Sequence, residues 1–278
     1  MPHFANGYEG DTVSLGYILQ AQSHEDVFIP GVTENPNISV SVNGEVAYLY
    51  LPADASIGSG TVGGQVTFAS KGVSTVTIPM LTAKTISDVI PHANFMTVAA
   101  DVVNARWVQQ TEKLQDEINL AGLTVLKAGA TATANTTALT SANIYETILT
   151  DIKEFKTNTA NKSLKLKPTG MIVGATGEAL LLNSPQFLRS TIVGDEAVKN
   201  GVIGSIAGVP VISSVELDAL GADYIIVNCL GIGIPTNVNS AKQFDATPVG
   251  YIDGTGLAAE VGYGTYVKAN FAYYHKGV

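Results

Sequence analysis

Apolar and polar positions alternate in short runs between Asn37 and Lys84. Three β-branched residues at 38, 40 and 42 are separated by serines, and a second apolar run follows at 46–51. Asn43-Gly44, between these runs, favours the type I′ turn of a tight hairpin. A second strand pair is predicted at 65–68 and 73–78. The pattern predicts a long β-excursion over 37–84, which needs a partner surface because a lone ribbon is marginal in water.

The period changes to that of an α-helix over about 95–121. Apolar residues recur three, four or seven positions apart, and charged or amide residues fill the rest; the apolar set is Val103, Trp107, Leu114, Ile118 and Ala121. We expect a long amphipathic helix that ends at Gly122, since glycine commonly follows a helix C-terminus. Trp107 lies in the apolar stripe and is interpreted as a core anchor.

The second half of the chain mixes short strands with short helices. A second helix is predicted from Ile144 to Phe155, and Asn143-x-x-Glu146 matches a capping box. Short buried strands are predicted at 171–173 and 224–227, with a short helix at 178–182. Residues 263–274 alternate in polarity and predict one long closing strand.

The run 201–217 joins glycines to β-branched residues and predicts a tight hairpin. Gly201, Gly204 and Gly208 are expected where a side chain would obstruct close packing or a positive φ. Pro210 is expected to fix the turn into the strand that follows.

The composition indicates a surface covered by something other than water. Hydrophobic residues make up 46% of the 278 residues and charged residues 14%, against roughly 25% charged residues in soluble proteins. No apolar stretch approaches the roughly 18 residues of a membrane helix, so contacts between subunits are the preferred explanation. The formal net charge of −9 disfavours sequence-independent binding to nucleic-acid backbones. The N-terminus shows no secretory signal, and the one cysteine, Cys229, cannot form an intramolecular disulfide, so a cytoplasmic site of folding fits.

Motifs of known enzymes are incomplete. Gly231-x-Gly233 follows a predicted strand, but Thr236 stands where a dinucleotide fingerprint has its third glycine. The four histidines are scattered without metal-ligand spacing, and neither a phosphate loop nor a nucleophile elbow occurs. The sequence therefore predicts no catalytic residue, no cofactor and no metal site.

The order of these segments resembles that of tailed-bacteriophage major capsid proteins with the Hong Kong-97-like fold. Three segments carry the resemblance: residues 75–90, the hairpin 201–217, and 263–267 with its Tyr263-Gly264 pair. The resemblance implies an α+β fold with an N-terminal arm (1–36), an extended β-loop (37–84), a peripheral domain with a spine helix (85–138), an axial domain (139–235) and return strands (236–278). The residues that we single out as structural or assembly positions are Asn43, Gly44, Trp107, Gly201, Gly204, Gly208, Pro210, Tyr263 and Gly264.

The resemblance implies a structural function. Copies would form hexamers and pentamers of an icosahedral shell around double-stranded DNA, assembled in the host cytoplasm, with scaffolding, portal or decoration proteins as further partners and no membrane. Lys71 and Lys84 are candidates for covalent crosslinking by position alone. Three alternatives stay open: an encapsulin-type nanocompartment that encloses protein, a secreted adhesin or surface-layer protein, and an enzyme of unrecognised type.

Overall fold

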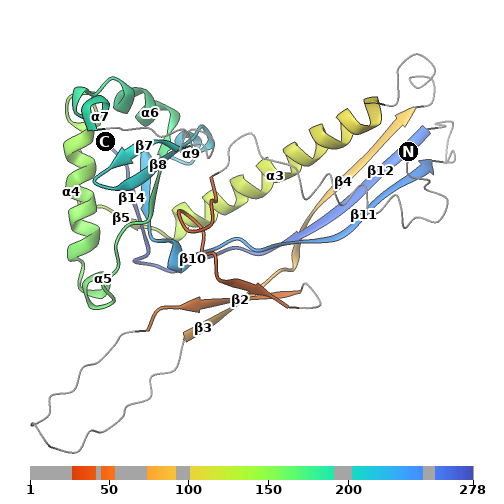
Figure 1. The fold of residues 1–278 in the computed structure, drawn as a ribbon, viewed down its shortest axis with the longest axis horizontal. Helices are drawn as coiled ribbons and strands as arrows, with labels where there is room; N and C mark the ends of the chain where they lie inside the picture. Colours follow the sequence, from red (N-terminus) through yellow and green to blue (C-terminus); the bar gives the residue numbers. More distant parts are fainter. Residues whose placement is uncertain are drawn as a thin grey trace, which may run out of the picture.

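The computed structural model of the chain describes residues 27–41, 45–53, 74–91, 101–190, 202–246 and 254–277. Several predicted features lie outside these ranges, namely most of the arm, the strand at 65–68, Asn43, Gly44, Lys71 and Gly201. The described residues form an elongated molecule, with a lobe of helices and strands at one end and long strands beside one helix at the other (Figure 1).

The lobe is built on a six-stranded mixed sheet. Its strands, in spatial order, are β5 (Thr131–Ala132), β14 (Ala272–His275), β9 (Tyr224–Val227), β6 (Gly170–Gly174), β8 (Val209–Ser214) and β7 (Val202–Ile206). The pairs β6–β8 and β5–β14 are parallel, and the others are antiparallel. All five residues of β6 are buried, as expected for a central strand covered on both faces.

Helices pack on both faces of the six-stranded sheet. On one face lie α4 (Ile144–Thr157), α6 (Ala175–Leu182) and α7 (Pro185–Ser190), and α5 (Thr159–Ser163) follows α4. The predicted stripe of α4 is confirmed, because Ile144, Ile148, Ile152 and Phe155 are all buried against the sheet. The other face packs against α9 (Glu216–Ala219) and the end of α3 (Asp101–Gly129).

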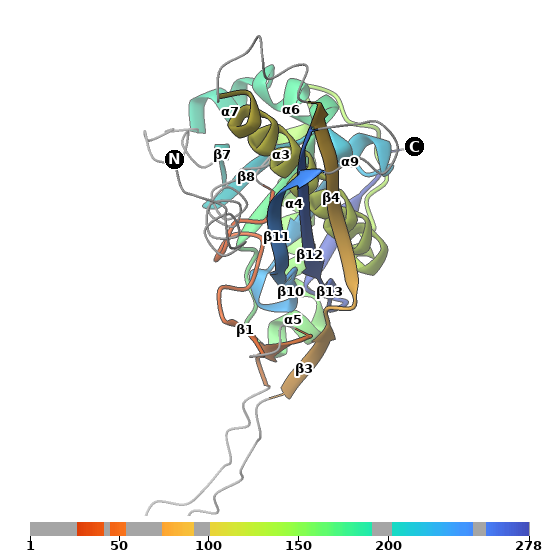
Figure 2. The ribbon, with the colours of Figure 1, turned by 90° about the vertical axis from the view of Figure 1, so that its right-hand side faces the viewer.

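The rest of α3 covers a second, three-stranded antiparallel sheet. This sheet has the order β11 (Thr236–Ala246), β12 (Gly254–Tyr263), β4 (Thr82–Pro91), so β4 forms one edge (Figure 2). The strands β12 and β4 pair over ten residues without a shift, whereas β11 has a bulge between Val238 and Ser240. Trp107, Leu114 and Ile118 of α3 bury the inner side of the sheet.

A smaller sheet has the order β1 (Ile38–Val40), β2 (Val46–Leu51), β3 (Ser74–Pro79), all antiparallel. The strand predicted at 73–78 is therefore paired with β2, whose Leu51 lies opposite Ser74. A short 3₁₀ turn, η1 (Cys229–Gly231), leads into β10 (Ile232–Gly233), which pairs with β13 (Tyr266–Val267).

The predicted end of the long helix at Gly122 is wrong. The apolar stripe continues through Leu123 and Leu126, which pack on the six-stranded sheet, so α3 runs to Gly129. Gly122 allows Ile234 and Phe28 to pack closely against α3, since a Cβ there would collide with both side chains.

Two further predictions are also wrong. The segment 263–274 is not one strand: it leaves β12 at Tyr263, forms β13, turns at Asn270 with φ 71° and joins the other sheet as β14. The capping box does not form, because the Asn143 side chain accepts the Thr140 N–H and donates to the Ala138 carbonyl.

Candidate assembly surfaces and a buried polar cluster

The β1–β2–β3 sheet has one buried and one exposed face. Its inner side chains, Ala47, Leu49, Leu51, Ile78 and Met80, form a small core. On the outer face, Tyr48 and Tyr50 are 39% and 48% exposed and stand opposite Thr77 and Thr75. With Ser39 beside Tyr48, these five residues form an uncharged face, which we call the tyrosine face. Tyrosine is enriched and charged residues are depleted at the core of protein–protein contacts.

Charged pairs hold β4 onto α3. The Lys84 ammonium lies 2.8 Å from a Glu117 carboxylate oxygen, and this pair lowers the pKa of Glu117 and raises that of Lys84. Asp88 accepts hydrogen bonds from Arg106 and Gln110, and the Arg106 guanidinium lowers the pKa of Asp88. Lys84 therefore lies on β4 and faces α3.

The glycine-rich hairpin is β7–β8, and its turn is Ala207-Gly208. Both residues have positive φ, 51° and 77°, which is the geometry of a type I′ turn. Gly204 is buried beside a register shift in β7. Pro210 pairs only with Ser205 of β7, because the ladder with β6 starts at Val211. The missing N–H of Pro210 therefore interrupts no ladder with β6.

Trp107, Tyr263 and Gly264 lie in the interior. Trp107 and Tyr263 belong to one buried cluster between α3 and the three-stranded sheet. Gly264 donates its N–H to the Pro235 carbonyl at 3.0 Å, and a Cβ there would lie 2.7 Å from Ile78 Cγ2. The structure thus places these three residues in packing positions, and any part that they take in assembly stays a prediction.

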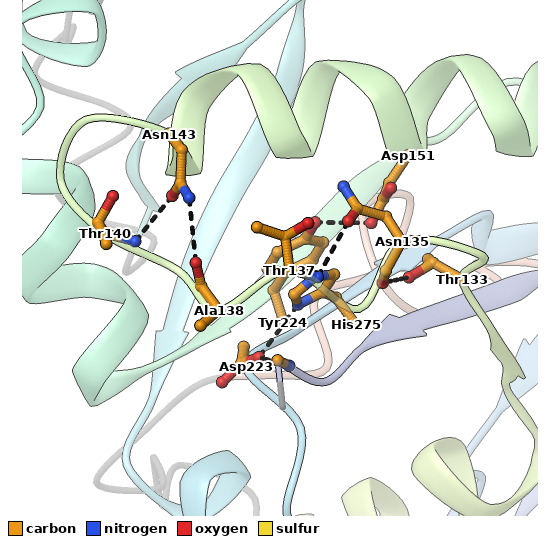
Figure 3. Close-up of polar contacts among 11 residues, drawn as sticks. Thr133, Asn135, Thr137, Ala138, Thr140, Asn143, Asp151, Asp223, Tyr224 and His275 are labelled. Carbon is orange, nitrogen blue, oxygen red and sulfur yellow. Dashed lines mark hydrogen bonds and ion pairs between the residues drawn. The ribbon is translucent and has the colours of Figure 1, made fainter.

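A polar cluster that the sequence analysis did not predict lies inside the lobe (Figure 3). Tyr224 donates its hydroxyl to Asp151 at 2.7 Å, and its ring stacks on His275 with centroids 4.9 Å apart. His275 Nδ1 lies 3.0 Å from the Asp223 carboxylate, which also accepts the Gly277 N–H. Desolvation raises the pKa of both Asp151 and Tyr224.

The polar cluster is suited to holding elements together. Asp151, Tyr224 and His275 are fully buried, so a substrate has no access to them. They belong to α4, β9 and β14. Asp223, the residue before β9, binds both His275 and the backbone of Gly277. In the described ranges, no three His, Cys, Asp or Glu side chains are grouped so that they could hold a metal ion. Within the same ranges no helix has both the length and the hydrophobicity of a membrane span.

Solved structures match almost the whole chain. A chain from Mycobacterium phage Che8 superposes with a TM-score of 0.58 at 12% identity, over 92% of this chain and 97% of that one. A chain from the capsid structure of cyanophage P-SCSP1u gives 0.58 at 13% identity, over 93% and 92%. This chain has the Hong Kong-97-like capsid fold. The α+β Hong Kong-97-like fold predicted from the order of the sequence segments is therefore confirmed, while the arm and the extended loop stay predictions.

The chain also resembles a subunit of a virus-like particle. The virus-like particle from Pyrococcus furiosus matches with a TM-score of 0.52 at 12% identity, over 95% of this chain and 97% of that one. No protein-family model and no curated protein matches the sequence. The Hong Kong-97-like fold is thus shared without a match to any family model or curated protein. The buried contacts of Asp151 and His275 were found only in the structure.

Proposed function

We propose that this chain is the major capsid protein of a tailed phage. The observation that carries the proposal is the match to phage capsid chains over more than nine-tenths of both chains. A fold alone does not determine function, but here the match covers the lobe, the long helix and the long strands together. A shell subunit also needs no catalytic site.

The surface supports assembly into a shell. The tyrosine face and the outward side of β4, with Thr85, Ser87 and Val89, are exposed and uncharged. Such faces become buried when copies pack beside one another, which fits the low charged fraction of 14%. We propose head-to-tail contacts that close by rotation into hexamers and pentamers.

The finer parts of the proposal follow from the sequence order. We divide the chain into arm (1–36), extended loop (37–84), peripheral domain (85–138), axial domain (139–235) and return strands (236–278). The shell would assemble in the host cytoplasm, with scaffolding, portal or decoration proteins. The net charge of −9 suits a shell that encloses DNA without binding it tightly.

A nanocompartment shell is the second candidate, favoured by the likeness to the Pyrococcus particle. The Che8 and P-SCSP1u chains superpose with a higher TM-score, 0.58 against 0.52, so we rank the nanocompartment below a phage capsid. The two functions differ in cargo. Proteins docked inside purified particles would support the nanocompartment, and nuclease-protected DNA would support the phage shell.

Electron microscopy of the purified chain tests the proposal directly. The chain is expressed alone and with candidate scaffolding protein, then separated by size and stained. We expect closed particles or rings of five and six subunits. A chain that stays monomeric by light scattering under all these conditions would overturn the proposal.

A further inference from the structure

Positive charge is concentrated in one short stretch of the lobe. Residues 153–167 contain five of the 15 Lys and Arg residues but only one of the 24 Asp and Glu residues. This stretch therefore has a net charge of +4, which leaves −13 for the rest of a chain whose total is −9. We call the five side chains the lysine patch: Lys153 and Lys156 of α4, Lys162 of α5, and Lys165 and Lys167 in the loop before β6.

The lysine patch is exposed and its charges are unpaired. All five lysines are exposed, and no ion pair between described residues includes any of them. The one acid of the stretch, Glu154, instead accepts the backbone N–H of Ala134 at 3.1 Å and 3.3 Å from its two carboxylate oxygens. Figure 1 and Figure 2 place α5 at one end of the lobe, with α6 and α7 at the other end. The patch thus forms a local positive surface on an acidic subunit.

The folded backbone holds part of the patch in a fixed arrangement. Lys165 and Lys167 flank Leu166, whose side chain is buried in the core of the lobe. The Leu166 N–H donates to the Asn161 carbonyl at 2.8 Å, and the Lys167 carbonyl accepts the Asn228 side chain at 2.6 Å. Because this loop is already ordered, its lysines lose less conformational freedom on binding a ligand than lysines of a flexible tail would.

Helix stabilisation accounts for only two of the five lysines. Lys156 and Lys162 lie in the last turns of α4 and α5, where a positive charge interacts favourably with the negative end of a helix. Lys153, Lys165 and Lys167 lie outside these turns. These three charges therefore need another explanation.

The polar character of the patch favours nucleic acid over protein as its ligand. None of the large hydrophobic side chains that are exposed in the described ranges lies within 153–167, whereas the centre of a protein–protein contact is depleted in charge. The lysines are interspersed with exposed hydroxyl groups of Thr157, Thr159 and Ser163, and Lys, Ser and Thr all contact phosphates. Phe155, the one aromatic residue of the stretch, is buried, so bases of a single strand would find no ring to stack on.

We propose that the lysine patch binds the phosphate backbone of double-stranded DNA without reading its sequence. This inference rests on the proposed shell function, and it turns the α4–α5 end of the lobe towards the packaged DNA. A few phosphate contacts per subunit give weak, salt-sensitive binding. The charge of −13 on the rest of the chain repels DNA elsewhere, so the contact is confined to the patch.

Salt-dependent binding of the purified, unassembled chain tests the proposal. The anisotropy of a labelled duplex of about 25 base pairs is measured at several salt concentrations. With four or five phosphates contacted, the logarithm of the binding constant should fall with the logarithm of the salt concentration with a slope of about −4. A slope close to zero, or no binding at low salt, would overturn the proposal.

Charge removal tests whether the patch is the site. Lys165→Gln combined with Lys167→Gln should make the slope shallower by about 2 and weaken binding at low salt about tenfold. Arginine at both positions should bind as the wild type does. Lys113→Gln combined with Lys276→Gln, at exposed positions outside the patch, makes the same change in net charge and should leave the slope unchanged. A glutamine variant of the patch that is folded by circular dichroism and keeps the wild-type slope would overturn the assignment.

The remaining outcomes separate this inference from the shell function. Particles that form from a chain that does not bind the duplex would overturn the inference and leave the shell function standing. Salt-sensitive binding by a chain that forms no particles would support the patch and count against the shell function. Binding of poly-glutamate without binding of the duplex would identify an acidic protein as the ligand and overturn the assignment to DNA.

Discussion

The six-stranded sheet and the β1–β2–β3 sheet differ in how much of their surface the chain itself covers. Helices pack on both faces of the first, and every residue of β6 is buried. The second buries one face and leaves Tyr48 and Tyr50 exposed on the other. The lobe can therefore hold itself together, whereas the smaller sheet offers a face that another copy can cover. The regions thus differ in how far each is covered by its own chain.

The largest expected effect comes from the core of the lobe. Phe155 is fully buried, and its ring meets Tyr273 edge to face at 5.2 Å. Phe155→Ala should lower the free energy of unfolding of the unassembled subunit by about 3–5 kcal/mol. Urea denaturation of the variant and the wild type measures this change in the free energy of unfolding. A loss below about 1 kcal/mol would show that the packing of the six-stranded lobe contributes little to the stability of the subunit.

A second effect concerns the junction between the two regions. Glu34 accepts the Ile234 N–H at 3.1 Å, and burial raises the pKa of this carboxyl to about 7. Because the folded state favours the neutral acid, ionisation of Glu34 destabilises it. This destabilisation grows as the pH rises from 4.5 towards 7. The cost at pH 8 is about 3 kcal/mol.

Glu34→Gln keeps an acceptor for Ile234 and removes the charge. The variant should be more stable than the wild type at pH 8 by up to about 3 kcal/mol, with the difference vanishing below about pH 4.5. Thermal melts across this range measure it, and the exposed Glu216→Gln is the control. Equal pH profiles for Glu34→Gln and the wild type would rule out the burial of this charge.

The hairpin of the lobe gives a smaller effect. Gly208 has φ 77°, and a Cβ there meets nothing within 4 Å, so Gly208→Val is expected to act through backbone strain. A cost of about 1–2 kcal/mol follows, with more loss of assembly than of secondary structure. Ala207→Gly, at φ 51°, should be neutral or stabilising. Normal particles from Gly208→Val would contradict the turn's part in assembly.

The smallest effect on stability is expected at the tyrosine face. Tyr48→Ser combined with Tyr50→Ser should change the free energy of unfolding by no more than about 0.5 kcal/mol per site. The effect is small because both side chains are solvent-exposed in the single subunit. The yield of particles should nevertheless fall. Thr157→Ser, on the exposed side of α4, is a control for both measurements. A double variant that assembles fully would show that no neighbour covers this face.

The sequence by itself was sufficient to predict helices and strands whose apolar residues repeat regularly within the element. The stripe of α4 and the strands β2, β6 and β9 were predicted, because side-chain spacing reports which face of one element is apolar. The order of these elements was also enough to identify the Hong Kong-97-like fold.

Only the tertiary structure decided where elements end and which polar groups meet. The helix α3 passes Gly122 because its later turns have a second sheet to pack on, and the alternation at 263–274 is divided between two sheets. The cluster of Asp151, Tyr224 and His275 joins distant parts of the sequence, since Asp151 and Tyr224 are 73 positions apart. The physical reason is that periodicity shows which face of a helix or strand is apolar. It does not show which distant part of the chain packs on that face.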